Sequence, residues 1–388
     1  MSWNKRDMRH FLVFVTGFFI STAALAQSDD HFIWTDRQLN ELQEIVDNLP
    51  SEGLGHCSID DFSAPNSASD PNRRSRNATI AANQLIRAYM LGCSSSSDRI
   101  YWHITDDDRS MEMQPLLMMA LITNQIEPFF NALRPDNPNY NLLRAAYMKE
   151  KDPKKRRILA QNMERWRWMP MNLGSKYLIV NVASFEVTMW EDGQRIETWP
   201  VIVGKTKSKT PVFEAAVSGV VLNPWWEIPS SIVAEGIGSM VRNRPATARR
   251  KGYVLQNGRY RQRPGPGNAL GQMKLVMPNP YSVYLHDTPN KSLFSKPVRT
   301  FSHGCIRVGD ALEFAKFLLK DVATAEKVDN ILASKKTTTV SLNQSIPLYI
   351  TYFTAEGAAD STIRYFPDVY RRDAAVIAKR EQRLDCAT

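Results

Sequence analysis

Four residues in the second half of the chain could together carry out nucleophilic chemistry. His286 ends a short apolar run, and His303, Cys305 and Arg307 follow within a few positions of one another. A cysteine is a strong nucleophile only as a thiolate, so it needs a base or a cation beside it. Gly304 leaves the backbone amides beside Cys305 unobstructed, as an oxyanion site requires. The segment therefore predicts a cysteine nucleophile, with Cys305 remaining a free thiol.

Two other interpretations use the same residues. His286, His303 and Cys305 could supply three zinc ligands, but the sequence offers no recognisable fourth ligand or metal-site helix motif. The second alternative is a structural role, with an inert thiol and buried histidines. It would be the default for any one of these residues alone, and it is less favoured here because His, Gly, Cys and Arg lie within five positions. We expect no metal and no cofactor.

The second half of the chain is predicted to be mainly β. Residues 177–190 and 196–203 are rich in β-branched and aromatic residues, and Asp192-Gly193 between them favours a hairpin turn. Helices are expected only near residues 310–319 and 323–332. Further strands are expected at residues 217–222, 282–285, 338–342, 348–353 and 363–366. The pattern predicts a sandwich or barrel of antiparallel strands.

The first half is predicted to be helical. Thr35 and Gln38 have capping-box spacing before a one-face apolar pattern that Pro50 ends. Residues 79–91 indicate a second helix, closed by Gly92, and residues 111–133 a helical stretch broken near one of its two prolines. Asp152-Pro153 is typical of an N-cap and first turn. The fold class is thus α+β and multidomain, with a helical N-terminal domain before a mainly β domain.

The first residues predict export. A basic start precedes the apolar residues 11–23, and Ala24-Leu25-Ala26 has the small-x-small pattern of a cleavage site. We expect a signal peptide over residues 1–26 and a mature chain from Gln27. An uncleaved N-terminal anchor is the alternative.

The four cysteines fit an oxidising compartment. We expect Cys57 and Cys93 to form a disulfide, since each lies beside a loop-like stretch of the N-terminal region. Cys386 could replace either partner.

The chain is basic, with a formal net charge of +9. Residues 236–286 hold no acidic residue and nine basic ones, among them Arg249 and Arg250. Such a segment is either a solvated loop or an attractor of carboxylate-rich substrates. We expect no nucleic-acid partner, because an exported protein rarely meets one.

The motifs resemble those of the YkuD-type L,D-transpeptidases, bacterial enzymes that remodel peptidoglycan. Ser302-His303-Gly304-Cys305-Ile306-Arg307 and the upstream Tyr284-Leu285-His286-Asp287-Thr288-Pro289 carry the resemblance. Further similar segments are residues 201–205, 210–211, 223–229 and 264–271. The resemblance covers residues 163–319 closely, and indicates the larger Gram-negative members with a helical scaffold before a sandwich or barrel catalytic domain.

The resemblance implies a role for each matching residue. Cys305 would be the acyl-accepting nucleophile and His286 its general base, held by a backbone carbonyl just after it. Arg307 would bind a substrate carboxylate or brace the loop. The oxyanion site and pocket would be shaped by Ser302, His303 and Gly304. Tyr284 and Trp226 would be aromatic pocket residues, although ordinary core packing explains both nearly as well.

The implied reaction is acyl transfer through a thioester, in the periplasm. The donor would be a tetrapeptide stem and the acceptor the diaminopimelate amine of another stem. Water as acceptor would make the protein a carboxypeptidase, and a few relatives join L-alanine to diaminopimelate instead. Carbapenem acylation is expected. The alternative from another class is a wall-binding scaffold protein with a degenerate centre.

The expected domains follow from these observations. A signal peptide over 1–26 precedes a helical scaffold over 27–170 and a catalytic domain over 171–335, with strands and a helical tail over 336–388. Residues 232–263 would form a lid whose Arg249 and Arg250 hold substrate carboxylates. We find no separate peptidoglycan-binding module among the helices.

Overall fold

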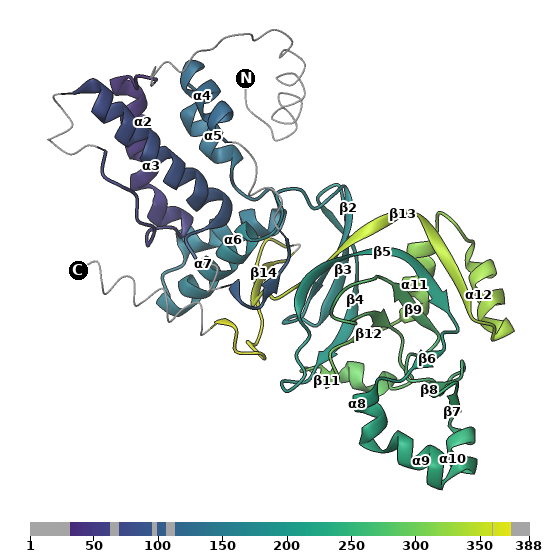
Figure 1. Ribbon diagram of the computed structural model, residues 1–388. Coiled ribbons are helices and arrows are strands. Elements are labelled where there is room, and N and C mark those ends of the chain that lie inside the picture. The colour runs from purple at the N-terminus through teal and green to yellow at the C-terminus, as the bar shows by residue number, and fades with distance from the viewer. Residues whose placement is uncertain (1–31, 63–69, 95–98, 106–112, 359, 374–388) are drawn as a thin grey trace.

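In the computed structural model the helices of residues 36–167 gather at one end of the molecule, and most strands lie at the other end with further helices beside them (Figure 1). The structure describes residues 32–62, 70–94, 99–105, 113–358 and 360–373. The expected signal peptide, Cys386 and most of the expected C-terminal helix lie outside these ranges. Among the described residues, every helix is too short or too polar to cross a bilayer.

Four helices share one hydrophobic core. They are α2 (Asp36–Asp47), α3 (Pro71–Leu91), α4 (Gln114–Ile122) and α5 (Ile126–Ala132), with the short 3-10 turn Leu49–Glu52 after α2. Leu42, Leu85 and Phe130 are among the buried side chains of this cluster. The predicted capping box is confirmed, because the Thr35 and Gln38 side chains each accept a hydrogen bond from the other residue's backbone N–H.

The expected break in residues 111–133 lies at neither proline. Asn124 adopts a left-handed φ of 53° between α4 and α5. Pro115 and Pro128 instead lie in the first turns of their helices. Amides there have no helical partner to lose, so proline is tolerated.

Two further helices pack into the hydrophobic core of the strand-rich part. They are α6 (Pro138–Lys149), which the sequence analysis missed, and α7 (Pro153–Arg167). Asp152 caps α7 as expected, accepting from the Lys154 and Lys155 amides. Tyr140, Leu159 and Trp166 pack in the same cluster as the sheet residues. Apart from residues 102–104, which pack with the strands, the packing therefore divides the described chain near residue 137.

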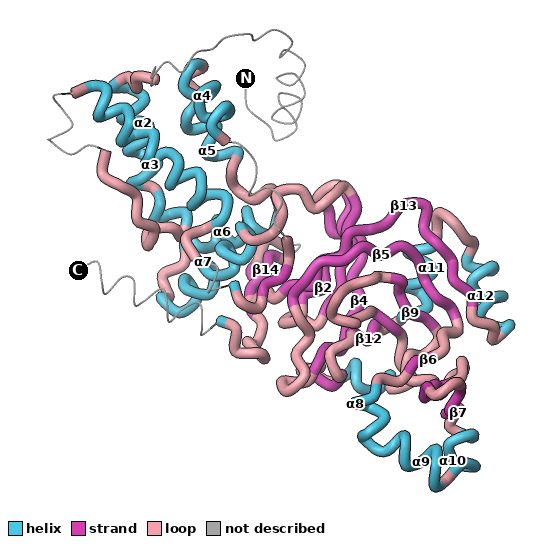
Figure 2. Tube along the Cα trace, in the orientation of Figure 1, coloured by secondary structure: helices cyan, strands magenta, loops and turns pink. Residues whose placement is uncertain are grey.

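Eight strands close into a barrel (Figure 2). The ring runs β5-β13-β2-β3-β4-β12-β10-β9 and returns to β5, while β1 and β11 add to β5 and β4. The bounds are β1 Trp102–His103, β2 Lys176–Asn181, β3 Glu186–Glu191, β4 Gln194–Gly204, β5 Val212–Leu222, β9 Met273–Val276, β10 Leu285–His286, β11 Thr300–Ser302, β12 Ile306–Val308 and β13 Thr338–Thr351.

The barrel differs from the sequence prediction in three respects. Residues 177–190 form two strands, because the turn between β2 and β3 uses buried apolar residues such as Val182 and Phe185 and carries no turn composition. The two strands expected at 338–353 are the single β13, with a register shift between Ser341 and Ile346. The pairings β13–β2, β10–β12, β1–β5 and β11–β4 are parallel. The other pairings of the ring are antiparallel as expected, so the sheet is mixed and not wholly antiparallel.

The predicted helices after β12 are present and cover part of the barrel. They are α11 (Ala311–Leu319) and α12 (Ala325–Ser334). Phe314 and Leu318 of α11 are buried in the barrel core.

Residues 226–262 form a small excursion from the barrel. It contains a three-stranded sheet, ordered β6 (Trp226–Glu227), β8 (Arg259–Gln262) and β7 (Tyr253–Gln256). Between β6 and β7 the chain forms α8 (Ser230–Ile232), a π-helical turn (Val233–Ile237), α9 (Gly238–Asn243) and α10 (Pro245–Arg250). Trp226, Ile228 and Leu270 form its buried cluster. Figure 1 shows α9 and α10 projecting beyond the barrel wall.

The last described residues return to the barrel. After the small sheet of β14 (Ala355–Gly357) and β15 (Ile363–Tyr365), residues 368–373 pack against the segment that follows β4. Tyr370 is fully buried there.

Candidate active site

Cys305 lies in a tight turn between β11 and β12. The Ser302 hydroxyl donates to the Cys305 carbonyl over 2.5 Å and accepts from the Gly304 amide over 3.0 Å. Gly304 has a φ of +122°, a backbone conformation that an L side chain rarely adopts. Ser302 and Gly304 thus fix the shape of the turn. The Gly304 amide is occupied by Ser302, so it is not the open oxyanion donor that the sequence suggested.

His286 is held on the strand beside this turn. Strand β10 runs parallel to β12, with His286 paired to Arg307, and antiparallel to β9, with His286 paired to Lys274. Paired residues point to the same face of a sheet. His286 Nδ1 lies 2.5 Å from the Asp287 carbonyl oxygen, so the ring is oriented by the backbone carbonyl just after it.

Tyr284 lies beside both Cys305 and His286. It precedes His286 by two residues, and their rings lie 5.6 Å apart. Tyr284 packs against the cluster that contains Trp226. The amide of Ile306, the residue after Cys305, donates to the Tyr284 carbonyl over 3.0 Å, and Tyr284 acts on the pKa of Cys305. Burial is the main cause that raises the pKa of Tyr284. The hydroxyl therefore stays protonated and can donate to the sulfur.

Lys274 is a site residue that the sequence analysis counted only as part of a basic segment. Its ammonium lies 4.5 Å from the centre of the Tyr284 ring, and its charge acts on Cys305. Burial lowers the pKa of Lys274. The sequence feature that could have indicated Lys274 as a site residue is its position inside the otherwise apolar strand Met273–Val276.

The electrostatics favour a neutral Cys–His pair at rest. Burial raises the pKa of the Cys305 thiol, and the opposing effects of Tyr284, Lys274 and Arg307 do not cancel it. Burial also lowers the pKa of His286 to about 4. At neutral pH the thiol keeps its proton and the imidazole is free to accept it, so the thiolate forms only when His286 takes that proton.

Asp287 holds the turn after His286 and is not a third catalytic acid. One carboxylate oxygen accepts from the Thr288 amide over 2.7 Å and contacts the Lys291 ammonium, and the other accepts from the Gln272 amide over 2.8 Å. A Cβ on Gly271 would stand 2.2 Å from this carboxylate. Only glycine at 271 allows Asp287 this position.

A series of hydrogen bonds connects Tyr370, near the end of the described residues, to the Cys305 turn. The Thr210 hydroxyl donates to the Gly304 carbonyl over 2.8 Å. Tyr370 in turn accepts from the Thr210 amide over 3.2 Å and donates to the Gly204 carbonyl over 2.5 Å. The sequence analysis gave residues 368–373 no role at this site.

Three other expected residues are exposed. His303 is exposed and its Nε2 stands 3.2 Å from Glu235 in the π-helical turn, so it connects the Cys305 turn to the expected lid. Arg249 and Arg250 are exposed on α10, in the part of the segment that projects away from the barrel (Figure 1). The structure does not bring these two arginines to Cys305.

The cysteines divide into a disulfide and a free thiol. Cys57 and Cys93 are joined, with Cα atoms 5.6 Å apart, and Cys305 is free. Among the described residues, the group of potential metal ligands that lie close together is His56, Cys57 and Cys93. Both of its sulfurs are committed to the disulfide. His286, His303 and Cys305 do not gather their donor atoms in this way, so the geometry does not favour the zinc interpretation.

Comparison with known proteins assigns the strand-rich part of the chain. Residues 175–340 match the model of the L,D-transpeptidase catalytic domain. These residues therefore belong to the YkuD family of L,D-transpeptidase catalytic domains. Residues 23–146 match the model of a scaffold domain. The transpeptidase domain is thus preceded by helices with a family model of their own.

A curated relative agrees with this assignment. A protein of Haemophilus influenzae, named as an L,D-transpeptidase, is 30% identical over 284 residues, which are 67% of this chain. The chain spans 58% of that relative's length.

Solved structures of L,D-transpeptidases are also similar. One from Mycobacterium smegmatis is 17% identical over 46% of this chain and 58% of its own, with a TM-score of 0.26. Transpeptidase 3 of Mycobacterium tuberculosis, carrying a faropenem-derived adduct, is 16% identical over 46% and 60%, with a TM-score of 0.25.

Proposed function

We propose that the protein is a periplasmic L,D-transpeptidase that cross-links peptidoglycan stem peptides through a thioester on Cys305. One observation carries the proposal. The Tyr284 ring lies 5.6 Å from the His286 ring, and the Tyr284 carbonyl accepts from the Ile306 amide next to Cys305. The proposed nucleophile and base therefore lie beside one another where the paired strands β10 and β12 of a rigid barrel meet the Cys305 turn.

Acylation begins from the neutral pair. His286 takes the Cys305 proton as the sulfur attacks a peptide carbonyl, and the carbonyl oxygen becomes an oxyanion. The Cys305 amide would stabilise that oxyanion, since the Gly304 amide is used by Ser302. The tetrahedral intermediate then collapses, the C–N bond breaks, and the leaving amine takes the proton from His286.

The second half-reaction returns the enzyme to its starting state. An acceptor amine attacks the thioester and gives a proton to His286, and the C–S bond breaks. Cys305 leaves as a thiolate and recovers its proton from His286. The new amide bond joins two stems, so atoms and charge balance without a cofactor.

The charges of the site suit an anionic substrate. Arg307 and Lys274 lie on either side of His286 in the sheet, where they can bind stem carboxylates. We propose a tetrapeptide stem as donor and the diaminopimelate side-chain amine as acceptor. Reaction of Cys305 with a carbapenem follows from the same nucleophile. Export to the periplasm rests on the pattern of residues 1–26.

The proposal is tested with the chain from Gln27 to Thr388 and purified disaccharide-tetrapeptide, analysed by mass spectrometry. A cross-linked dimer that has lost one alanine, absent with Cys305→Ala, is the expected product. A tripeptide monomer alone would identify a carboxypeptidase. If neither forms, intact sacculi distinguish a donor bond to L-alanine from binding without reaction, and either outcome overturns the proposed reaction.

A further inference from the structure

Lys274, His286 and Arg307 form a row across three neighbouring strands of the barrel. His286 on β10 is paired with Lys274 on β9 and with Arg307 on β12, so the three side chains lie on one face of the sheet. The base thus has a cation on either side of it.

The Lys274 side chain reaches the aromatic ring beside the nucleophile. Its Nζ lies 4.5 Å from the centre of the Tyr284 ring, and the Tyr284 carbonyl accepts from the Ile306 amide next to Cys305. The charge of Lys274 lowers the pKa of the Cys305 thiol, and a negative charge on Cys305 raises the pKa of Lys274. Position and electrostatics therefore both connect this ammonium to the sulfur.

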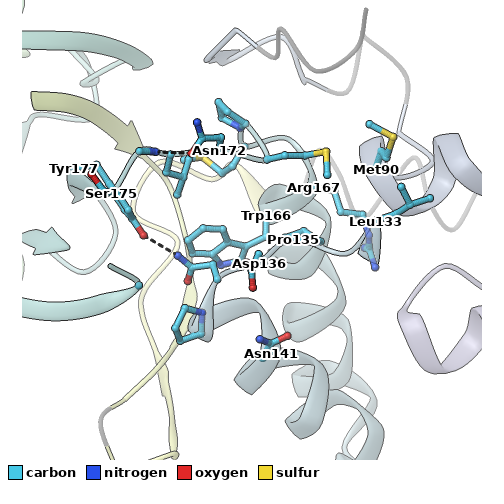
Figure 3. Close-up of a pocket in the computed structure, with 18 of the residues that line it drawn as sticks. Met90, Leu133, Pro135, Asp136, Asn141, Trp166, Arg167, Asn172, Ser175 and Tyr177 are labelled. Atoms are coloured by element: carbon cyan, nitrogen blue, oxygen red, sulfur yellow. Dashed lines mark hydrogen bonds between the residues drawn. The ribbon is translucent and has the colours of Figure 1, made fainter. Parts of the chain in front are cut away.

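Lys274 is half-buried without an anion bound to it. Among the described residues, no carboxylate makes a salt bridge with Lys274, and the one that acts on it, Glu227, is salt-bridged to Arg261 over 2.6 Å. By contrast, the buried Arg167, beside the cavity of about 500 Å³ where the helices meet the barrel (Figure 3), lies 3.6 Å from the Glu164 carboxylate. Buried charges are normally paired, so the lone ammonium indicates that a negative charge forms beside it during function.

The resting contacts of the sulfur favour the neutral thiol. Cys305 Sγ donates to the Ser282 carbonyl over 3.8 Å, and burial raises the pKa of the thiol. A hydrogen bond made by the neutral form of an acid disfavours its charged form. The thiolate that forms when His286 takes the proton therefore loses its contact with Ser282 and needs a cation in its place.

Lys274 suits this need better than Arg307 does. The charge of Arg307 lowers the pKa of His286 as well as that of the thiol, so it opposes protonation of the base, while the Asp287 carboxylate acts on His286 in the other direction. On Cys305 itself, the charge of Lys274 has the larger effect of the two cations.

We propose that the Lys274 ammonium, held against the Tyr284 ring by a cation–π contact, stabilises the Cys305 thiolate. Its part in turnover rests on the proposed function, whereas its effect on the thiol does not. The proton of Cys305 passes to His286, Lys274 keeps its own proton, and its charge balances the sulfur until the C–S bond forms. Unlike the binding of a stem carboxylate by Lys274, this role requires no carboxylate in the electrophile.

The test is therefore alkylation by iodoacetamide, a small neutral reagent, between about pH 6 and 10. The full chain is used, and mass spectrometry follows the peptide that contains Cys305. Lys274→Met removes the charge and keeps a side chain of similar length, while Lys274→Arg keeps a cation that can stack on Tyr284. The matched control, Lys320→Met, removes an ammonium that lies 5.0 Å from the centre of the Phe317 ring at the end of α11.

Lys274→Met should displace the pH profile of alkylation upward by about one pH unit, because the thiolate loses its cation. At pH 7 the rate should fall about three- to fourfold and not tenfold, since a thiolate of higher pKa is a stronger nucleophile. Lys274→Arg and Lys320→Met should keep the profile of the unaltered chain. The thermal stability of Lys274→Met should not fall, because burial disfavours the charge that is removed.

Two results would overturn the inference. One is the same profile for Lys274→Met and Lys320→Met. The other is a displaced profile for Lys274→Arg, since that variant keeps the positive charge.

Cross-linking of disaccharide-tetrapeptide, measured separately, distinguishes this inference from the proposed reaction. A thiol whose alkylation depends on Lys274, in a chain that forms no cross-link, would reject the proposed reaction and keep the role of Lys274. Cross-linking by a chain whose alkylation does not depend on Lys274 would do the reverse.

Discussion

At the scale of single residues, His286 would set how the proposed reaction depends on pH. Burial lowers its pKa to about 4, so the ring stays neutral, and able to accept a proton, throughout the range in which an ordinary histidine becomes charged. We expect the acid limb of kcat/KM for the free enzyme to have a midpoint near pH 4. A pH–rate profile with a carbapenem or tetrapeptide measures it, and a midpoint near 6.5 would contradict a buried base.

Two buried groups, Glu356 and His286, change the stability of the fold with pH in opposite directions. Burial raises the pKa of Glu356 to about 7. A raised carboxyl pKa costs stability as pH rises from about 4.5 to 7, while the lowered pKa of His286 adds stability from about 4 to 6.5. Each effect is ~3 kcal/mol, so they largely cancel in this window.

Glu356→Gln should therefore expose the His286 effect. The variant's free energy of unfolding should rise steeply between pH 4 and 6.5, whereas that of the unaltered chain stays nearly flat. Urea denaturation at several pH values measures both curves. Parallel curves would show that Glu356 does not titrate in this range.

At the scale of elements, hydrogen bonds from residues 368–373 position the Cys305 turn. Tyr370→Phe removes the hydroxyl that joins Thr210 to the Gly204 carbonyl, and Thr210 holds the Gly304 carbonyl. We expect kcat to fall about tenfold with little change in KM, and a stability loss of about 1 kcal/mol.

A matched tyrosine separates this role from a general loss of stability. Tyr365→Phe removes the same group from an exposed position on β15 and should change neither quantity. If Tyr370→Phe lowers stability alone and leaves kcat intact, Tyr370 is structural only.

Elements whose signals are local were predicted from the sequence. The cap of α2, the start of α7 and the adjacency of Cys305 to a tight glycine turn depend on neighbouring residues. The break at Asn124 was missed because prolines usually mark helix ends. Lys274 and Tyr370 were missed as site residues because β9 pairing and the return of the chain after β15 place them there. Such contacts join segments that no local pattern relates.

At the scale of the whole molecule, the disulfide stabilises one of two cores. Cys57 and Cys93 are 36 residues apart and pack against the α2–α5 cluster, not the barrel. Replacing both with serine should destabilise that cluster by about 3–4 kcal/mol, through greater freedom of the unfolded chain. Hydrogen exchange should show lost protection in α2–α5 with the barrel unchanged. Equal loss in both parts would mean that they unfold as one unit.

Strand β13 has a consequence for the order in which the protein can be made. It lies between β5 and β2, although almost 120 residues separate it from β5 in the sequence. A nascent chain on the ribosome completes α2–α5 early, but its barrel keeps a gap between those strands until residue 351 has emerged. His286 and Cys305 are both synthesised before that gap can close, so an unfinished chain carries both proposed catalytic residues without the closed wall that holds them together.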